Sequence, residues 1–513
     1  MADRILLRGG KIYLGSGRLL QAGYIVIEDG WIAGIGEGNP PADSQAQVVD
    51  LTERLILPGV ADSHLHLVAY ALSRKRLDLS QVTSLEEALT LVGRHAADLP
   101  PGKWLLGRGW DKQRLGLDRF PDKSMLDQVA PRNPVALDSH DGHLIWVNSV
   151  ALAKLGLSDS LPRIEGGRIE TDAQGRPTGI FMEKAVGLVR RLIDREQASL
   201  VIEAISDACQ HLLKLGITSL HTIEGHEHAR YLDQALDLGK VPQRLFRLEE
   251  VSSVSDLGSL RSSSECIKLY ADGALGSQTA YMFEAYEGQP QNLGIRATDK
   301  REIEAIALAA AAKGLAVAVH AIGDRANSEV LDAYTAVRSR FPDAILRIEH
   351  AQVLRQSDIK RFASLGIIAS MQPIHVIADM GLASRLWGSR CRFAYAWRSL
   401  LEGDVPIAFG SDAPIEDPDP LKGIYAAVTR RKPGSPQWYP EQCISLAQAI
   451  DCYTLGGALA SGRDRQIGSI AVGKAADFTV LQDDILGCND PGKVLETRVW
   501  MTIIGGQIAY AAS

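Results

Sequence analysis

Two histidines, His64 and His66, stand two residues apart, just after an apolar run that begins at Leu55 and leads into the turn signal Pro58-Gly59. Side chains alternate between the two faces of a strand, so both imidazoles point the same way if this segment is extended. Two imidazoles directed at one point can bind a divalent metal ion. Neighbouring histidines also occur on ordinary polar surfaces, so this pair alone leaves both interpretations open.

Three more metal-competent side chains each lie at the end of a strand-like run, and they follow in the order His320, His350 and Asp412. A single histidine at a strand end is more often a satisfied polar residue than a ligand. Three such positions after a His-x-His pattern are hard to explain without a shared site. Together they favour a metal centre.

Lys268 stands in the same kind of position, within the apolar run 266–270. An ammonium group cannot ligate a metal ion, and the ordinary interpretation is a cation at a strand end. A lysine carboxylated by carbon dioxide is instead an anionic oxygen donor that can bridge two cations. The residues leave both states of Lys268 open.

The elements that must position these side chains alternate between helix and strand. Glycine is the usual residue just after a helix, and near-continuous apolar strands belong in a parallel sheet covered by helices. Repetition of this unit predicts an α/β fold, a (β/α)8 TIM-like barrel, whose active site lies at the C-terminal ends of the strands. The helical segments are residues 199–215, 299–313, 357–365 and 400–402, followed by Gly216, Gly314, Gly366 and Gly403.

Both ends of the chain are rich in short β-type runs. Residues 4–56 contain several such runs separated by glycines and by Asp29-Gly30, a strong hairpin signal, and the C-terminal residues repeat this pattern. We therefore expect a small β-sandwich built from residues 1–58 and 466–513. Residues 59–465 would form the barrel, with an insertion of about residues 68–195 after the first barrel strand.

The insertion carries polar and aromatic groups in irregular, glycine-containing segments, which suit a pocket wall over the barrel mouth. His140 and His143 are candidate catalytic groups, since a histidine there would hydrogen-bond a carbonyl oxygen as charge develops on it. The alternative is that these groups only hold the loop together, and specificity would then depend on loops near residues 273–277 and 372–375. The candidate substrate-binding residues are Trp110, Asp111, Asp141 and Asn148.

A second group of histidines, at His221, His226 and His228, surrounds the dipeptide Glu224-Gly225. Glycine and the polar neighbours favour a loop here. We therefore expect these histidines to be exposed and not to form a metal cluster.

Bulk properties restrict the partners. The net charge is −7, from 55 basic and 62 acidic residues, which disfavours nucleic acid and anionic membranes. The six cysteines include no Cys-x-x-Cys pair, which predicts reduced thiols of a cytoplasmic protein. The N-terminus does not resemble a signal peptide, and no apolar run reaches the roughly 18 residues of a membrane span. A small molecule is the expected partner, and a homodimer is a possible assembly.

The ordered set His64-x-His66, Lys268, His320, His350 and Asp412 resembles the amidohydrolase superfamily. The resemblance covers nearly the whole chain. One departure is His221-Thr222, where an acidic residue is expected. Segments in the insertion narrow the resemblance to the amidohydrolase 3 branch, which includes N-substituted formamide deformylases: residues 109–111, 138–143 and 146–149.

This resemblance implies a hydrolase that cleaves an amide-like C–N bond of a small molecule with one or two divalent ions, Zn²⁺ being the expected metal. His64, His66 and Asp412 would hold the more buried ion. Lys268, if N6-carboxylated, would bridge to a second ion at the two later histidines. The metal would lower the pKa of its water, and Asp412 would take the proton and pass it to the leaving amine.

Two alternatives come from other classes. A mononuclear deaminase of the same superfamily would carry an acid soon after the fifth-strand histidine, and residues 320–323 offer none. A non-catalytic barrel that acts as a binding protein would be expected to have lost ligands, and the expected ligands are all present. Hydrolysis of a panel of N-acyl and N-formyl amines would separate the three.

Overall fold

The computed structural model describes residues 4–512 except 39, 41–45, 113, 140–143, 158–160, 163, 165–166, 197 and 489, and it leaves the side chains of residues 194–200 undescribed. Two compact units make up the chain. One contains Met1–Tyr70 and Ser206–Ser513, and the other contains Ala71–Ile205. The second unit takes the place of the predicted insertion, and its boundary falls within helix α6 (Ala198–Lys214).

Eight strands of the first unit form one parallel sheet in the order β21-β20-β19-β18-β17-β16-β15-β8. Each strand pairs in parallel with its neighbours, and most strand residues are buried, as expected for a sheet covered by helices. The strands are β8 (Val60–Leu65), β15 (Ile217–Glu224), β16 (Arg244–Glu250), β17 (Cys266–Tyr270), β18 (Ala316–Ala321), β19 (Leu346–His350), β20 (Ile368–Met371) and β21 (Ile407–Phe409).

Backbone hydrogen bonds join the first and last strands of this sheet just beyond β21. The amide of Asp412 donates to the carbonyl of His64 at 2.7 Å, and the amide of His66 donates to the carbonyl of Ala413 at 2.9 Å. These bonds nearly close the sheet, so the predicted TIM-like barrel is confirmed. They also hold the carboxylate of Asp412 beside the imidazoles of His64, which lies on β8, and of His66, which directly follows β8.

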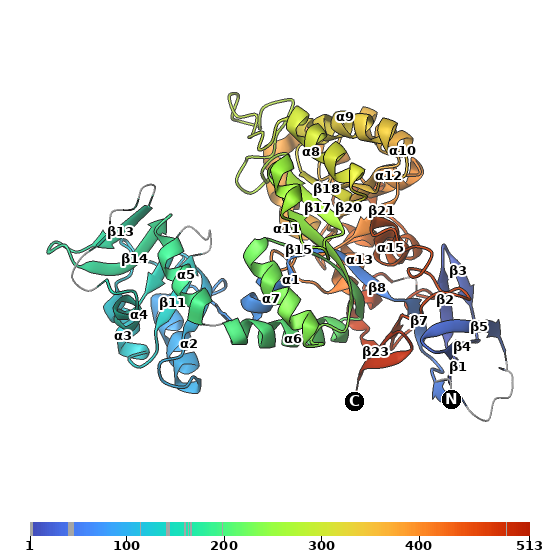
Figure 1. The fold of residues 1–513 in the computed structure, drawn as a ribbon, viewed down its shortest axis with the longest axis horizontal. Helices are drawn as coiled ribbons and strands as arrows, with labels where there is room; N and C mark the ends of the chain where they lie inside the picture. Colours follow the sequence, from blue (N-terminus) through green and yellow to red (C-terminus); the bar gives the residue numbers. More distant parts are fainter. Residues whose placement is uncertain are drawn as a thin grey trace. The chain divides into compact units, whose positions relative to one another are not determined.

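Helices follow the strands and lie outside the barrel, as Figure 1 shows for α8 and α9 beside β17 and β18. Gly216 and Gly314 follow α6 and α8 with φ of +84° and +76°, a left-handed conformation that glycine adopts without strain. In the described part of the chain, no helix is long and apolar enough to cross a membrane. The remaining helices of this unit are α7 (His226–Asp237), α8 (Lys300–Ala312), α9 (Asp324–Arg340), α10 (Gln356–Leu365), α11 (His375–Trp387), α12 (Trp397–Glu402), α13 (Pro420–Thr429), α14 (Leu446–Tyr453), α15 (Leu455–Ala460) and α16 (Lys493–Glu496).

Two further sheets of the first unit use both ends of the chain, which lie in the same region of Figure 1. A four-stranded sheet has the order β5-β4-β1-β6, and a six-stranded sheet has the order β24-β23-β22-β7-β2-β3. Their side chains share one hydrophobic core, in which Leu7 and Ile25 of the first sheet lie with Phe478 of the second. The strands are β1 (Arg4–Arg8), β2 (Lys11–Gly15), β3 (Arg18–Leu20), β4 (Gly23–Glu28), β5 (Trp31–Glu37), β6 (Gln47–Asp50), β7 (Leu55–Pro58), β22 (Phe478–Leu481), β23 (Val499–Ile504) and β24 (Gln507–Ala511).

Strand β7 connects these sheets to the barrel. It pairs with β2 on one side and with the C-terminal strand β22 on the other, and after Gly59 the chain continues directly into β8. The start of the barrel strand that carries His64 is therefore fixed by strands from both ends of the chain. The predicted division at residues 58 and 466 stays a prediction, because these sheets and the barrel belong to one compact unit.

The second unit is built on a six-stranded sheet with the order β13-β14-β12-β11-β10-β9. Alternate residues of β12 face different cores: Trp146 belongs to one hydrophobic cluster, and Ile145 and Val147 belong to another. The elements are β9 (Leu77–Asp78), β10 (Leu105–Trp110), β11 (Val135–Ser139), β12 (Leu144–Val147), β13 (Gly167–Thr171), β14 (Pro177–Glu183), α2 (Leu85–Asp98), α3 (Lys123–Val129), α4 (Ser149–Lys154) and α5 (Val186–Glu196), with α1 (Leu67–Arg74) leading into the unit.

Candidate metal and active site

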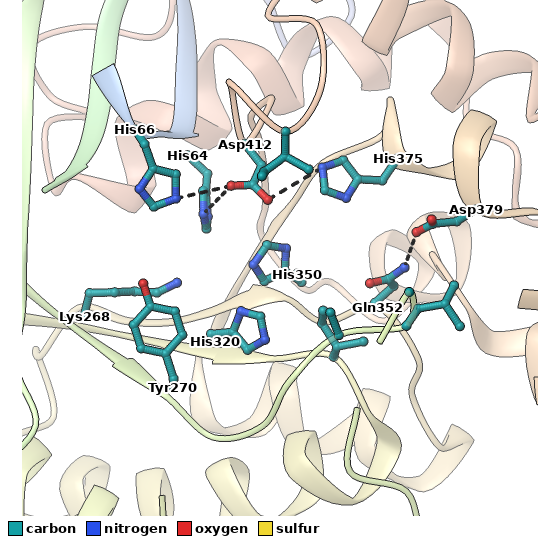
Figure 2. Close-up of a pocket in the computed structure, with 15 residues that line it drawn as sticks. His64, His66, Lys268, Tyr270, His320, His350, Gln352, His375, Asp379 and Asp412 are labelled. Carbon is teal, nitrogen blue, oxygen red and sulfur yellow. Dashed lines mark hydrogen bonds and ion pairs between the residues drawn. The ribbon is translucent and has the colours of Figure 1, made fainter. Parts of the chain in front are cut away.

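A pocket of about 370 Å³ collects the side chains that the sequence singles out as metal ligands. They come from β8, β17, β18 and β19 and from the residues just after β8 and β21, and Figure 2 shows them around one space. The barrel thus brings together residues that are separated by up to 348 positions in the chain, from 64 to 412. The six are His64, His66, Lys268, His320, His350 and Asp412.

The two histidines of the His-x-His pattern have defined tautomers. Nδ1 of His64 lies 2.5 Å from a carboxylate oxygen of Glu349, and Nδ1 of His66 lies 3.1 Å from the carbonyl oxygen of Ile223. Both partners only accept hydrogen bonds here, so each Nδ1 carries the proton. In the neutral rings each Nε2 is therefore an acceptor, which is the form that ligates a metal.

The two acceptor nitrogens both lie near a carboxylate oxygen of Asp412, which is a third acceptor. Oδ1 of Asp412 lies 3.4 Å from Nε2 of His64 and 3.4 Å from Nε2 of His66, beyond the usual hydrogen-bond range. Such an arrangement needs a proton or a cation to offset the repulsion between lone pairs. Ligands about 2.0–2.1 Å from a tetrahedral zinc ion are roughly 3.3–3.4 Å apart, so the spacing fits a metal ion of this size.

The charges around His64 and Asp412 also favour a bound cation. Burial opposes a charged imidazole, but the carboxylates of Asp412 and Glu349 outweigh it and raise the pKa of His64. Burial would also raise the pKa of Asp412, yet the adjacent imidazoles of His64 and His66 hold it well below its usual range. The site is thus built to keep Asp412 ionised and to attract a positive charge.

His350 extends the donor set away from this pair. The ring centre of His350 lies 4.9 Å from that of His64 and 4.5 Å from that of His320. One ligand atom each of His64, His350 and Asp412 lie within 4.8 Å of one another. Burial lowers the pKa of His350 well below normal and that of His320 to about 3, so these two rings are neutral and available as ligands. Nε2 of His320 donates to the carbonyl of Gly273 at 3.0 Å, which leaves its Nδ1 unprotonated.

Two of these candidate ligands have an uncommon backbone. His350 has φ of +70° and Asp412 has φ of +62°. The left-handed region is costly for residues other than glycine, although Asp and His adopt it more often than most. Strained residues of this kind are concentrated at functional sites, where the surrounding structure holds them in place.

Lys268 is buried in the pocket wall, with 1% of its surface exposed. Its ammonium nitrogen lies 4.8 Å from the ring centre of Tyr270, and among the described residues it has no hydrogen-bond or ion-pair partner. Burial lowers the pKa of Lys268, and the charges of Glu349 and Asp412 oppose this shift. A lowered pKa favours the neutral amine, which is the form that reacts with carbon dioxide.

A buried charge network supports His64 from behind. Arg347, on β19, is 0% exposed and donates from Nε to Oε1 of Glu349 at 2.8 Å. The same guanidinium donates at 2.7 Å to the carbonyl of Ser63, the residue before His64. Although burial opposes it, Arg347 together with His64 lowers the pKa of Glu349 well below normal, so this carboxylate is ionised and fixes the His64 tautomer.

The pocket also contains polar residues that sequence reasoning did not assign. His375 begins α11, and its Nε2 lies 3.7 Å from Oδ2 of Asp412 without a hydrogen-bond partner in the described chain. Tyr270, Gln352 and Asp379 complete the polar lining. The sequence indicated such lining residues only through the alternative that loops near 273–277 and 372–375 set specificity. Residues 274–276 and His375 do line the pocket.

The candidate residues of the insertion have a different outcome. Trp110 is 0% exposed, and its indole donates to the carbonyl of Leu137 at 2.8 Å. Asn148 is also fully buried, accepts from the amides of Val135 and Ala151, and donates to two backbone carbonyls. The structure therefore corrects the expected substrate contacts of Trp110 and Asn148, because their polar atoms are used within the second unit.

The other insertion candidates stay predictions. Asp111 accepts from the amide of Arg114 at 2.8 Å in a turn of the second unit. His140, Asp141 and His143 lie outside the described residues. Their expected catalytic and substrate-binding roles are thus neither supported nor contradicted.

The expectation of exposure at the second histidine group is wrong for His221. This residue lies on β15 and is 0% exposed, and its Nδ1 accepts from Arg347 at 2.9 Å. Burial and the positive charge of Arg347 lower the pKa of His221 well below normal, so it is a neutral part of the barrel core. His226 and His228 lie on α7, where the side chain of His228 is 41% exposed.

Comparisons with known proteins identify the family of this chain. The model of the amidohydrolase family matches residues 47–510. YtcJ of Bacillus subtilis is 33% identical over 99% of this chain and its own full length, and the N-substituted formamide deformylase of Arthrobacter pascens is 29% identical over 95% of this chain and 94% of its own. A solved structure of an uncharacterised metal-dependent hydrolase from Pyrococcus horikoshii has a TM-score of 0.79 at 27% identity and covers 95% of this chain and 99% of its own. The chain belongs to the amidohydrolase family.

Proposed function

We propose that the protein is a metal-dependent hydrolase that cleaves an amide-like C–N bond of a small molecule, with Asp412 as general base and acid. The observation that carries this proposal is the set of acceptor atoms around Asp412: its Oδ1 lies 3.4 Å from Nε2 of His64 and 3.4 Å from Nε2 of His66, and ligand atoms of His64, His350 and Asp412 lie within 4.8 Å of one another. Similarity to a protein named N-substituted formamide deformylase supports N-formyl and N-acyl amines as the substrate class.

His64, His66 and Asp412 would hold one ion, and His320 and His350 a second, with N6-carboxylated Lys268 between them. Imidazole and carboxylate donors suit Zn²⁺. When bound, a divalent cation acts here as a Lewis acid, which lowers the pKa of a water molecule and polarises the substrate carbonyl.

Side chains of the protein would transfer the proton from the attacking water to the leaving group. Oδ1 of Asp412 faces the two imidazoles, so Oδ2 is the oxygen left to take a proton from the attacking water and deliver it to the leaving nitrogen. Nε2 of His375 lies on the Oδ2 side of this carboxylate and has no protein partner within the described chain. It is placed to hydrogen-bond the substrate carbonyl oxygen as negative charge develops there.

The test is hydrolysis of N-formyl and N-acyl amines by zinc-loaded protein, followed by release of free amine. A chelator should abolish turnover, added metal should restore it, and His64→Ala should lose bound metal and activity together. His95→Ala is the matched control, since His95 lies on α2 of the second unit and should retain both. Full turnover by a metal-free protein, or by His64→Ala, would contradict the proposal.

Lys268 gives an independent prediction. Lys268→Ala should lower metal affinity or turnover by at least the roughly 10–100-fold that follows loss of a supporting group at a metal site. Short carboxylic acids should restore part of the activity by replacing the missing carboxylate. Lys268→Arg should be equally inactive, because a guanidinium keeps the positive charge but cannot be carboxylated. Wild-type kinetics for Lys268→Arg would rule out the carboxylated form.

A further inference from the structure

The far end of the pocket from Lys268 carries a second polar group, formed by Asp379 and Gln352. Figure 2 shows both on the opposite side of His350 from Lys268. Oδ2 of Asp379 accepts from Nε2 of Gln352 at 2.7 Å and from the hydroxyl of Tyr395 at 2.5 Å, and Gln352 also donates to that hydroxyl. These three side chains come from the loop after β19, from α11 and from the segment before α12, so the barrel holds them together.

This network leaves acceptors and no donors facing the pocket. An ionised carboxylate only accepts, so the amide group of Gln352 must direct Nε2 toward Asp379 and keep Oε1 free. Both hydrogen bonds to Asp379 end on Oδ2. Among the described residues, no donor reaches Oδ1 of Asp379 or Oε1 of Gln352. A carboxylate accepts up to about four hydrogen bonds, so this group has unused capacity.

In the described part of the chain, no lysine or arginine lines this end of the pocket. Among the described residues that line the pocket as a whole, Lys268 is the only lysine or arginine, and it lies beside the metal ligands. Glu416 adds a second carboxyl group nearby: burial raises its pKa, His375 lowers it, and the charge of Asp379 raises it further. The lining of the same pocket includes the apolar side chains of Ile322 and Ile415.

We propose that this end of the pocket binds a protonated amine carried by the substrate, with Asp379 as its ion-pair partner and Gln352 as a second acceptor. An ammonium group has three donors and no acceptor, which complements two free acceptor oxygens and one unpaired negative charge. An alkyl spacer between the hydrolysed bond and the ammonium would pack on Ile322 and Ile415. This substrate class, the N-acylated or N-formylated diamine, rests on the proposed C–N hydrolysis.

Binding of products tests the amine site without turnover. Pentylamine and hexylamine match putrescine and cadaverine in chain length but carry a methyl group in place of the second ammonium group, and calorimetry on zinc-loaded protein gives the affinities of all four. Wild type should bind at least one diamine about 10-fold or more tightly than the monoamine, as expected for a charge-assisted hydrogen bond. Asp379→Asn should remove the difference, Asp379→Glu should keep part of it, and Asp237→Asn, at an exposed position on α7, should keep all of it.

Equal affinity of the wild type for diamines and monoamines, with both affinities unchanged in Asp379→Asn, would overturn the amine site. Hydrolysis of N-formylcadaverine against N-formylhexylamine separates this result from the proposed function. A preference of about 10-fold in kcat/KM that Asp379→Asn abolishes supports both. Hydrolysis of both compounds without a preference would overturn only the amine site. Diamine binding that depends on Asp379, with no hydrolysis of any N-formyl or N-acyl compound, would overturn only the C–N hydrolysis.

Discussion

Replacing Asp412 by asparagine should lower kcat by about 10²–10⁴-fold while leaving the fold intact, because the change removes a proton acceptor and almost nothing else. Asparagine keeps the shape of the side chain and one oxygen as a metal ligand. It is also one of the few residues that accept a positive φ, and Asp412 has φ of +62°. The backbone bond from residue 412 to the carbonyl of His64 does not depend on the side chain.

The measurement is kcat on a verified substrate together with metal content and thermal unfolding. Asp417→Asn is the matched control, because Asp417 lies five positions further on, is 44% exposed and pairs with Lys422 at the surface. It should retain wild-type kinetics. Loss of metal from Asp412→Asn would show that the residue acts chiefly as a ligand. Wild-type kcat in Asp412→Asn would contradict its role as base.

The barrel could be predicted because its strands have a local signal. Runs such as 316–320 and 367–371 are apolar nearly throughout, follow a helix and a glycine, and match β18 and β20 to within about one residue. The end of a strand also has a chemical signal, since a histidine or aspartate there stands out against apolar neighbours. All six predicted ligands consequently line one pocket.

Burial of polar residues inside the barrel could not be predicted in the same way. Arg347 and Glu349 alternate with apolar residues along β19, a pattern that fits a half-exposed strand, yet both are 0% exposed. His221 looked like part of a polar loop and is instead a buried partner of Arg347. These side chains are stable inside because they satisfy one another across strands that are far apart in sequence, and a local pattern does not contain that information.

The far wall of the pocket was missed for a related reason. Gln352, Asp379 and Tyr395 are ordinary polar residues in loops and helices, and their spacing has no recognisable period. Only the folded barrel brings them within hydrogen-bond distance. Conversely, Trp110 and Asn148 resembled pocket residues because large or polar groups next to glycines are typical of sites, whereas they stabilise the second unit from inside.

The buried network behind His64 predicts a large effect on stability. Arg347→Met has similar length but no charge, so Glu349 would stay in the barrel core without its cation and the carbonyl of Ser63 without its donor. Breaking a buried ion pair from one side typically costs about 3–5 kcal/mol, because the remaining charge is left uncompensated. We expect the free energy of unfolding of the barrel to fall by about this amount.

Two precautions allow the loss of barrel stability in Arg347→Met to be measured. A chelator should remove metal from both proteins, so that weaker metal binding does not add to the loss of stability. Two compact units need not unfold together, so hydrogen exchange of the β18–β20 amides in urea should be followed to report on the barrel itself. Trp110→Phe, in the core of the second unit, is the matched control and should leave barrel exchange unchanged.

A double variant separates the charge from the packing. Arg347→Met with Glu349→Gln leaves no uncompensated charge, so it should recover part of the loss and give a coupling energy of about 0.5–3 kcal/mol. Glu349→Gln alone should weaken metal binding by about 10–100-fold, because a neutral amide fixes the Nδ1 proton of His64 less strongly than a carboxylate at 2.5 Å. An Arg347→Met barrel within about 1 kcal/mol of wild type, or additive effects in the double variant, would show that packing and not charge holds His64 in place.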